Sequence, residues 1–198
     1  MKGRFSLPMS QEQCVEALTV AVRNEVELRW QTYRESTELA ECIRQTAQAM
    51  TSKDRFGIFF CGRCGNGKST MMRAIQQLTN LLKLTDRDGN RLAFRMCDAR
   101  EIVREYNRFY RGYELVRDCK LLAIDDLGLE PAEVMSYGNV YSPVVELLSH
   151  RYNEQLFTII TTNLQPAEVR EKYGDRIADR FNEMMKTIIF KNETYRGK

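Results

Sequence analysis

The fold of this chain is decided by the stretch Gly62-Arg63-Cys64-Gly65-Asn66-Gly67-Lys68-Ser69-Thr70. It holds a complete G-x-x-x-x-G-K-[ST] motif, the pattern of loops that bind phosphate groups. Its three glycines allow a tight turn whose N–H groups point at an anion, and a helix that follows adds its favourable dipole end. We expect all nine residues to bind nucleotide, with Lys68 at the β- and γ-phosphates, the Ser69 hydroxyl on Mg²⁺ and Thr70 near the α-phosphate.

The residues on either side of the loop predict a strand before it and a helix after it. The run Gly57–Cys61 is short and almost wholly apolar, which is typical of a buried strand, and 68–82 has helical character. The alternative is a glycine-rich turn with an incidental lysine. The strand–loop–helix context argues against that alternative and favours ATP with Mg²⁺ as the ligand.

Two carboxylates follow another apolar strand. Four apolar residues, 121–124, lead directly to Asp125 and Asp126. Phosphoryl transfer needs an acid that holds the metal at the end of a neighbouring strand. We expect Asp125 to hold Mg²⁺, through water, and Asp126 to orient or activate the attacking water. A strand that simply ends in a polar turn is the alternative.

A polar group also ends the strand that starts at Phe157. Thr161-Thr162-Asn163 follows its apolar residues, and an amide at this place can hold the lytic water or sense the γ-phosphate. Such a tripeptide is weak evidence by itself, because polar residues at a strand end are commonly just a turn. Its order and distance after Asp126 in the chain make it useful as evidence for a nucleotide site.

The remaining pattern predicts strands that alternate with helices, and therefore a mostly parallel sheet covered on both faces. Ser10 and Gln13 form a capping box for a first helix that runs to about Trp30, and Ser36 or Thr37 can cap a second. In such sheets ligands bind beyond the carboxyl ends of the strands. Further expected elements are strands at 92–97 and 187–190 and helices at 39–50, 99–111, 144–152, from Pro166, and at 175–185.

Length and composition limit the class of protein. The chain has 198 residues, enough for one domain, and its 30 Lys and Arg against 27 Asp and Glu do not by themselves indicate a nucleic-acid binder. No apolar run approaches the ~18 residues of a membrane span, and the start lacks the apolar region of a secretory signal. We expect a cytoplasmic protein that makes no membrane contact.

The six cysteines do not predict a metal or redox site. Cys61 and Cys64 form a C-x-x-C, but a structural zinc site needs a second pair, and His150 is the only histidine. The same residues also lie inside the phosphate-loop motif. We expect the cysteines to be free thiols at small buried positions.

Together these motifs resemble AAA+ ATPases, and more narrowly the DnaC/DnaI helicase loaders and the IstB transposition helper ATPases. The resemblance covers about residues 36–198. It rests on the order and spacing of five stretches: 62–70, 124–130, 161–164, 173–181 and the closing Glu193-Thr194-Tyr195-Arg196. It implies a P-loop NTPase of AAA+ type, a three-layer α/β/α fold with a mostly parallel five-stranded sheet and no separate C-terminal lid domain. Residues 1–35 would be an N-terminal helical segment before this ATPase core.

The resemblance also implies roles for single residues. Asn163 corresponds to the sensor-1 residue, Arg180 to the arginine finger that reaches a neighbouring subunit's γ-phosphate, and Arg176 to its companion. Arg196 would be a sensor-2-like arginine. Arg176 and Arg180 could instead pair with acids on a solvated helix face. Asp126 stands where many AAA+ proteins carry glutamate, and the shorter side chain makes slow hydrolysis the expectation.

A stripe of arginines marks the helix expected at 99–111. At 100° per residue, Arg100, Arg104, Arg108 and Arg111 gather on one side, opposite an apolar side that should pack on the sheet. Such a stripe suits the phosphates of single-stranded DNA, and by resemblance it lies where initiators and loaders contact that DNA. A solvated basic face, partly offset by Glu101 and Glu105, is the alternative.

Three functional hypotheses follow. The first is an ATPase accessory of DNA replication that resembles a helicase loader, binds single-stranded DNA and associates with itself through the nucleotide interface; an IstB-like transposition helper is its near alternative. The second is a nucleotide-gated adaptor with negligible turnover, suggested by Asp126. The third is a small-metabolite kinase, which the Asp-Asp and Thr-Thr-Asn strand ends disfavour. A replicative helicase or a transposase is the protein partner that the first hypothesis implies.

Overall fold

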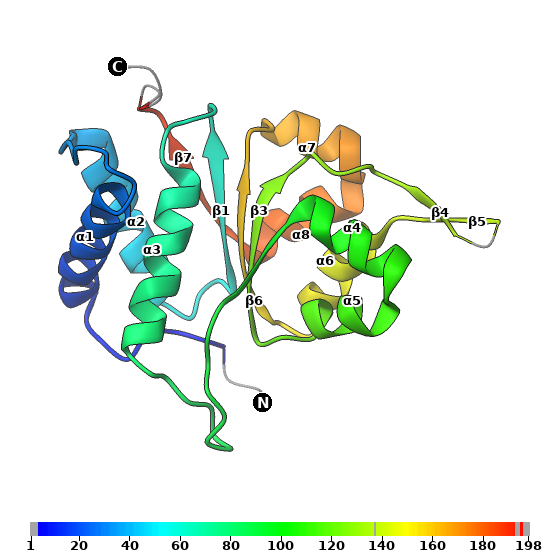
Figure 1. The fold of residues 1–198 in the computed structure, drawn as a ribbon, viewed down its shortest axis with the longest axis horizontal. Helices are drawn as coiled ribbons and strands as arrows, with labels where there is room; N and C mark the ends of the chain where they lie inside the picture. Colours follow the sequence, from blue (N-terminus) through cyan, green and yellow to red (C-terminus); the bar gives the residue numbers. More distant parts are fainter. Residues whose placement is uncertain (1–3, 137, 193–194, 196–198) are drawn as a thin grey trace.

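The chain folds around one parallel sheet of five strands. A computed structural model describes residues 4–136, 138–192 and 195. The strands of the sheet are β1 (Gly57–Gly62), β2 (Arg95–Asp98), β3 (Leu121–Leu127), β6 (Phe157–Thr162) and β7 (Lys186–Phe190). Their order is β2-β3-β6-β1-β7, and every neighbouring pair is parallel (Figure 1). All five carboxyl ends therefore lie at one edge, as the sequence predicts.

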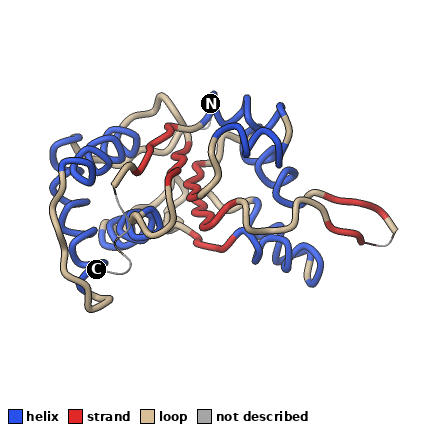
Figure 2. Tube along the Cα trace, turned by 90° about the horizontal axis from the view of Figure 1, so that it is seen from above, coloured by secondary structure: helices blue, strands red, loops and turns tan. Residues whose placement is uncertain are grey.

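Helices cover both faces of this sheet. One face carries α1 (Gln11–Glu27), α2 (Thr37–Thr51) and α3 (Lys68–Leu81), and the other face carries the later helices (Figures 1 and 2). These are α4 (Ala99–Arg108), α5 (Tyr110–Arg117), α6 (Pro143–Asn153), α7 (Pro166–Tyr173) and α8 (Asp175–Met184). The expected three-layer α/β/α fold is confirmed.

The first two helices begin where the capping residues predict. The Ser10 hydroxyl accepts the Gln13 N–H at 3.2 Å, and the Gln13 side chain accepts the Ser10 N–H at 3.0 Å, so the capping box forms. Ser36 accepts the Leu39 N–H at 3.1 Å and caps α2. Helix α1 ends at Glu27, earlier than expected, and Trp30 lies beyond it with a positive φ of 58°.

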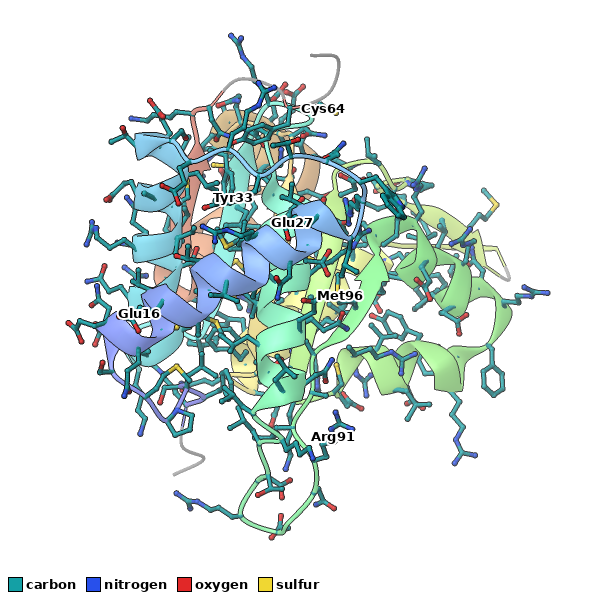
Figure 3. The ribbon with its side chains drawn as sticks, turned by 60° about the vertical axis from the view of Figure 1, so that its left-hand side comes forward. Glu16, Glu27, Tyr33, Cys64, Arg91 and Met96 are labelled. Carbon is teal, nitrogen blue, oxygen red and sulfur yellow. The ribbon has the colours of Figure 1, made fainter. Side chains whose placement is uncertain are left out.

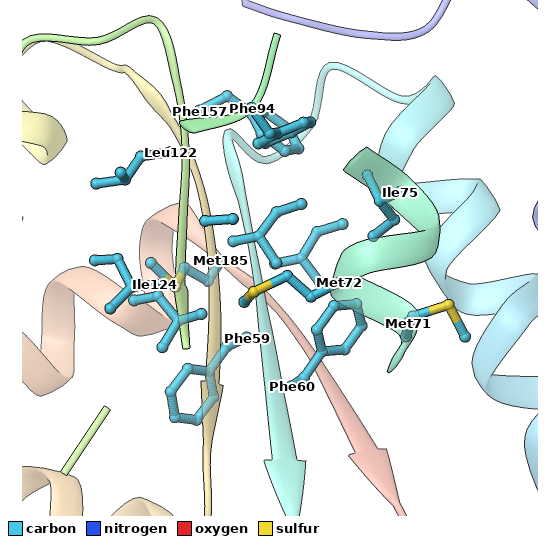
Figure 4. Packing of buried hydrophobic residues seen from close by; sticks show 14 of the residues in the cluster. Phe59, Phe60, Met71, Met72, Ile75, Phe94, Leu122, Ile124, Phe157 and Met185 are labelled. Carbon is cyan, nitrogen blue, oxygen red and sulfur yellow. The ribbon is translucent and has the colours of Figure 1, made fainter. Parts of the chain in front are cut away.

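The core is continuous across the sheet and the N-terminal helix. Phe94 and Phe157 lie with ring centroids 6.0 Å apart, and Met72 and Ile75 of α3 point toward the strands (Figure 4). Helix α1 packs against α2 and α3 (Figure 3) and buries Cys14, Leu18 and Val22 in the same hydrophobic core. The N-terminal segment thus contributes to the core rather than standing away from it.

Two further features differ from the sequence-based expectation. The helix expected at 99–111 is two helices, because the backbone of Phe109 leaves the helical region (φ −158°, ψ 88°) between α4 and α5. A small antiparallel hairpin, β4 (Val134–Ser136) and β5 (Asn139–Tyr141), projects from the molecule where no element was predicted (Figure 1).

None of the helices in the described ranges is both long and apolar enough to span a membrane.

Candidate nucleotide-binding site

The loop after β1 has the backbone that a phosphate cradle requires. Gly62 has φ +142°, and a Cβ there would lie 2.5 Å from the Phe190 carbonyl oxygen and 2.6 Å from Asn66 Nδ2. Only glycine fits this position. Gly67, with φ +97°, is the N-cap of α3, so the loop ends at a helix N-terminus, whose first N–H groups have no partners within the helix.

Lys68 lies at the centre of this loop and is 5% exposed. Its ammonium donates to the carbonyl oxygens of Gly62 and Arg63, both at 2.8 Å. It also donates to Oδ1 of Asn66 at 3.1 Å and to Oδ1 of Asn163 at 2.9 Å. Burial lowers the pKa of this ammonium, and the nearby Cys64 and Asp126 groups act in the opposite direction. The structure thus joins the loop directly to the amide at the end of β6.

The metal-ligand candidates also meet. The Ser69 hydroxyl donates to Oδ1 of Asp125 at 2.8 Å, across the gap between α3 and β3. A hydroxyl and a carboxylate are the hard oxygen donors that Mg²⁺ prefers, and that ion usually keeps several waters and substrate phosphates as its other ligands. These two side chains therefore fit a magnesium ion held beside a triphosphate.

Asp126 adopts a special backbone conformation. Its φ is +56°, and the register between β3 and β6 breaks between Ile124 and Leu127. Burial is the main cause that raises the pKa of its carboxyl, and the charges of Asp125 and Asp98 raise it further. Lys68 and Arg100 oppose this rise. The side chain is a carboxylate that holds a proton more readily than an ordinary aspartate.

Thr161 is a site residue to which the sequence assigned no role. Its hydroxyl donates to Oδ1 of Asp125 and accepts the N–H of Asp126 at 2.9 Å. It is fully buried, and it fixes both acids against β6. Asp98 of β2 is a second site residue without an assigned role, since it lies opposite Asp125 of β3 in the register of the two strands. The sequence signal for Thr161 is the polar strand end at 161–163, where the motif by itself points to Asn163.

The end of β7 and two described residues beyond it, Asn192 and Tyr195, contact the phosphate loop. Asn66 Nδ2 donates to the Phe190 carbonyl, and Asn192 Nδ2 donates to the Asn66 carbonyl, both at 2.9 Å. The Tyr195 N–H donates to the Gly65 carbonyl, also at 2.9 Å. Arg196, the sensor-2 candidate, lies outside the described residues. Arg63, Cys64 and Thr70 complete the loop, with Cys64 exposed at the edge of the molecule (Figure 3).

The two arginines of α8 have different surroundings. Arg176 is exposed. Arg180 is half-buried, with its guanidinium carbon 4.8 Å from the centre of the Tyr152 ring, and its buried Nη1 has no hydrogen-bond partner within the described chain. Arg176 is therefore the more accessible of the two finger candidates.

The arginine stripe is only partly as expected. Arg100, Arg104 and Arg108 are exposed on α4, while Arg111 lies on α5 beyond the break. Arg100 also pairs with Asp98 at 2.8 Å. Ile102 and Val103 are buried, but Phe109 and Tyr110 are more than half exposed instead of packing on the sheet. The prediction of one helix with a basic face opposite a packed apolar face is therefore wrong. At the α4–α5 junction, exposed aromatic rings stand beside the arginines.

Comparison with known proteins supports the fold. No family model and no curated protein matches the chain. Among solved structures, DnaI superposes with a TM-score of 0.62 at 20% identity over 98% of this chain and 97% of that one. The DnaC helicase loader gives 0.59 at 18% identity, over 80% and 93% of the two chains. A replication initiator DnaA bound to AMPPCP and single-stranded DNA gives 0.57 at 13% identity, over 87% and 50%. The predicted resemblance to the loaders is thus confirmed at the level of the fold.

Proposed function

We propose that this chain is a slow, Mg²⁺-dependent ATPase that acts as an accessory of DNA replication. One observation carries the proposal. Lys68 of the loop donates a hydrogen bond to Asn163, the residue after β6, while Ser69 bonds to Asp125 beside Asp126. Three sequence motifs far apart in the chain therefore form one site at the carboxyl edge of the sheet, where such folds bind ligands.

Each side chain has a part in hydrolysis. Loop N–H groups and Lys68 hold the phosphates, and Asn163 positions a water molecule. Asp126 takes a proton from that water while the water oxygen bonds to the γ-phosphorus. The bond between the γ-phosphorus and the oxygen that bridges to the β-phosphate breaks, which leaves ADP and phosphate. Ser69 and Asp125 would hold Mg²⁺, which would supply positive charge for the phosphate oxygens. Asp126 is short, so its reach to the water is poor and turnover is slow.

The fold neighbours support the replication assignment. DnaC and DnaI are similar to this chain in fold, and the similar DnaA structure contains AMPPCP and single-stranded DNA. On this chain the exposed Arg104, Arg108 and Arg111 with Phe109 and Tyr110 would bind single-stranded DNA, since arginines neutralise phosphates and aromatic rings stack on bases. A replicative helicase is the proposed protein partner, and ATP is proposed to promote self-association.

A nucleotide-gated adaptor with negligible turnover is the second candidate. The raised pKa of Asp126 favours it, because a carboxyl that holds its proton is a weaker base. Steady-state phosphate release, with and without single-stranded DNA, distinguishes the two candidates. Turnover that stops in Asp126→Asn establishes the ATPase. If the chain binds ATP but shows no Asp126-dependent turnover, the adaptor is established and our proposal is contradicted.

A further inference from the structure

A buried carboxylate lies close behind the two acids of β3. Glu130 is 3% exposed and follows Asp125 and Asp126 in the turn after the strand. It accepts the N–H of Gly128 at 2.8 Å and the hydroxyl of Tyr173, and its Oε1 lies 3.5 Å from the ammonium of Lys172. A buried charge is tolerated only with such partners. Two of the three donors belong to α7.

Lys172 also holds the backbone of the same turn. Its ammonium donates to the carbonyl oxygens of Gly128 at 2.5 Å and of Glu130 at 2.6 Å. The side chain is long enough to reach from α7 across to the turn, and it is mostly buried there. Helix α7 therefore binds both the main chain and the carboxylate of the segment that follows the acids.

The turn is equally tied to the end of β6. Gly128 has φ +110°, and a Cβ there would lie 2.7 Å from a methyl carbon of Leu164, the residue after Asn163. The Thr162 hydroxyl donates to the Leu127 carbonyl at 2.6 Å. The turn after β3 is thus held between the end of β6 and α7, with no space for a side chain at Gly128.

Helix α7 in turn fixes the start of α8. The two helices meet at Gly174, which has φ +83°. Arg170 of α7 donates to Asp175 and, at 2.9 Å, to Asp179, both on α8. Tyr173, the partner of Glu130, is the last residue of α7 and is buried. The first turns of α8, which carries Arg176 and Arg180, are therefore joined to the anchored end of α7.

We infer that Glu130 is a positioning residue that connects the acids of β3 to the arginines of α8 through Lys172 and Tyr173. A displacement of Asp125 or Asp126 when nucleotide binds reaches α8 through this buried cluster. The residue touches neither nucleotide nor water in this scheme. The consequence for hydrolysis rests on the proposed ATPase function, while the mechanical link between the turn and α8 does not.

Glu130→Gln tests the inference with the least change in shape. Glutamine keeps an oxygen that can accept from Tyr173 or Gly128, but it removes the charge that faces Lys172. Lys172→Met is the second variant, since it keeps the apolar stem and removes the ammonium. Glu171→Gln is the matched control, because Glu171 is exposed on the same helix. All variants are made in the full chain.

Two measurements are needed, hydrogen exchange without nucleotide and ATP turnover. We expect exchange in 124–131 and 175–184 to become at least about tenfold faster in Glu130→Gln and Lys172→Met, with no change in α3 and none in the Glu171→Gln control. We expect kcat to fall at least about tenfold while the Kd for Mg-ATP stays within about twofold.

The outcomes separate the inference from the proposed function. Unchanged exchange in α8 overturns the link, whatever the turnover. Faster exchange in α8 with unchanged kcat overturns the positioning role, since the cluster would then serve only stability. If the unaltered protein hydrolyses no ATP, the proposed function fails, and exchange in α8 still decides whether Glu130 connects the two segments.

Discussion

At the scale of single residues, the site is crowded with negative charge. Asp125, Asp126 and Asp98 come together at the ends of β3 and β2, and Lys68 and Arg100 are the cations that offset them. Burial, together with the charges of Asp125 and Asp98, raises the pKa of the Asp126 carboxyl. Charge of this kind suits a site that gains Mg²⁺ together with its substrate.

Asp126→Asn should stop hydrolysis and stabilise the nucleotide-free fold. Asparagine tolerates the positive φ of this position and removes a carboxylate that its neighbours disfavour. We expect kcat to fall by about 10²-fold or more and Tm at neutral pH to rise by roughly 1–3 °C. Thermal melts and phosphate release measure both effects.

The sign of the pH effect provides the control for that variant. The folded-state pKa of Asp126 is raised, so the wild-type chain gains relative stability as pH falls through that value. The Tm difference between wild type and Asp126→Asn should therefore shrink at low pH. A difference that grows toward acid pH would contradict the account of the crowded acids.

Turnover itself should have a narrow pH range. Asp126 must lose its proton to act as a base, so kcat falls as pH drops through a pKa above that of an ordinary aspartate. Lys68 must keep its proton to bind phosphate, so affinity falls as pH rises through a pKa below that of an ordinary lysine. Profiles of kcat and KM against pH measure the two limits. An acid limit at the ordinary aspartate value would contradict the role of Asp126.

At the scale of elements, arginine variants on the α4–α5 pair test the proposed binding of single-stranded DNA. Arg104→Gln and Arg108→Gln should each weaken binding to single-stranded DNA and reduce the slope of log K against log salt by about 0.7. Fluorescence anisotropy at several salt concentrations measures this. Arg44→Gln on α2 is a matched control, since Arg44 is exposed on the opposite face of the sheet (Figure 1) and forms an ion pair with Glu41 of the same helix. Equal loss in the control would contradict the assignment.

The sequence predicts most elements because their signals are local. Capping at Ser10 and Ser36, the apolar runs of the strands and the motif at 62–70 each act within a few residues. The break at Phe109 depends on distant contacts. It brings Tyr106, Tyr110 and Tyr113 together with Tyr141 of the hairpin.

The site is predictable to a similar extent. Motif spacing identified Lys68, Ser69, Asp125 and Asn163, which the structure joins by hydrogen bonds. Thr161 and Glu130 were not assigned roles, because their partners lie on other elements. Only the register of β3 against β6 places Thr161 beside the acids, and only the packing of α7 buries Glu130.

At the scale of the whole molecule, the proposed self-association is tested at the arginines of α8. Arg176→Ala should abolish ATP-dependent self-association without changing Tm, because Arg176 is exposed. Arg180→Ala should abolish self-association too, and it should lower Tm by roughly a few degrees because it loses the contact with the Tyr152 ring. Sedimentation with a non-hydrolysable ATP analogue and thermal melts measure the two effects. Self-association that persists in both variants would contradict a finger on α8.

The most direct test of the account is the affinity for Mg-ATP in wild type and in Lys68→Ala, by calorimetry. Lys53→Ala, at an exposed lysine outside the site, is the control. Loss of a charge-assisted contact with phosphate should weaken binding at least about tenfold, or about 1.4 kcal/mol, while the control keeps its affinity. Equal affinity in wild type and Lys68→Ala would show that the segment beginning at Gly62 does not hold the triphosphate.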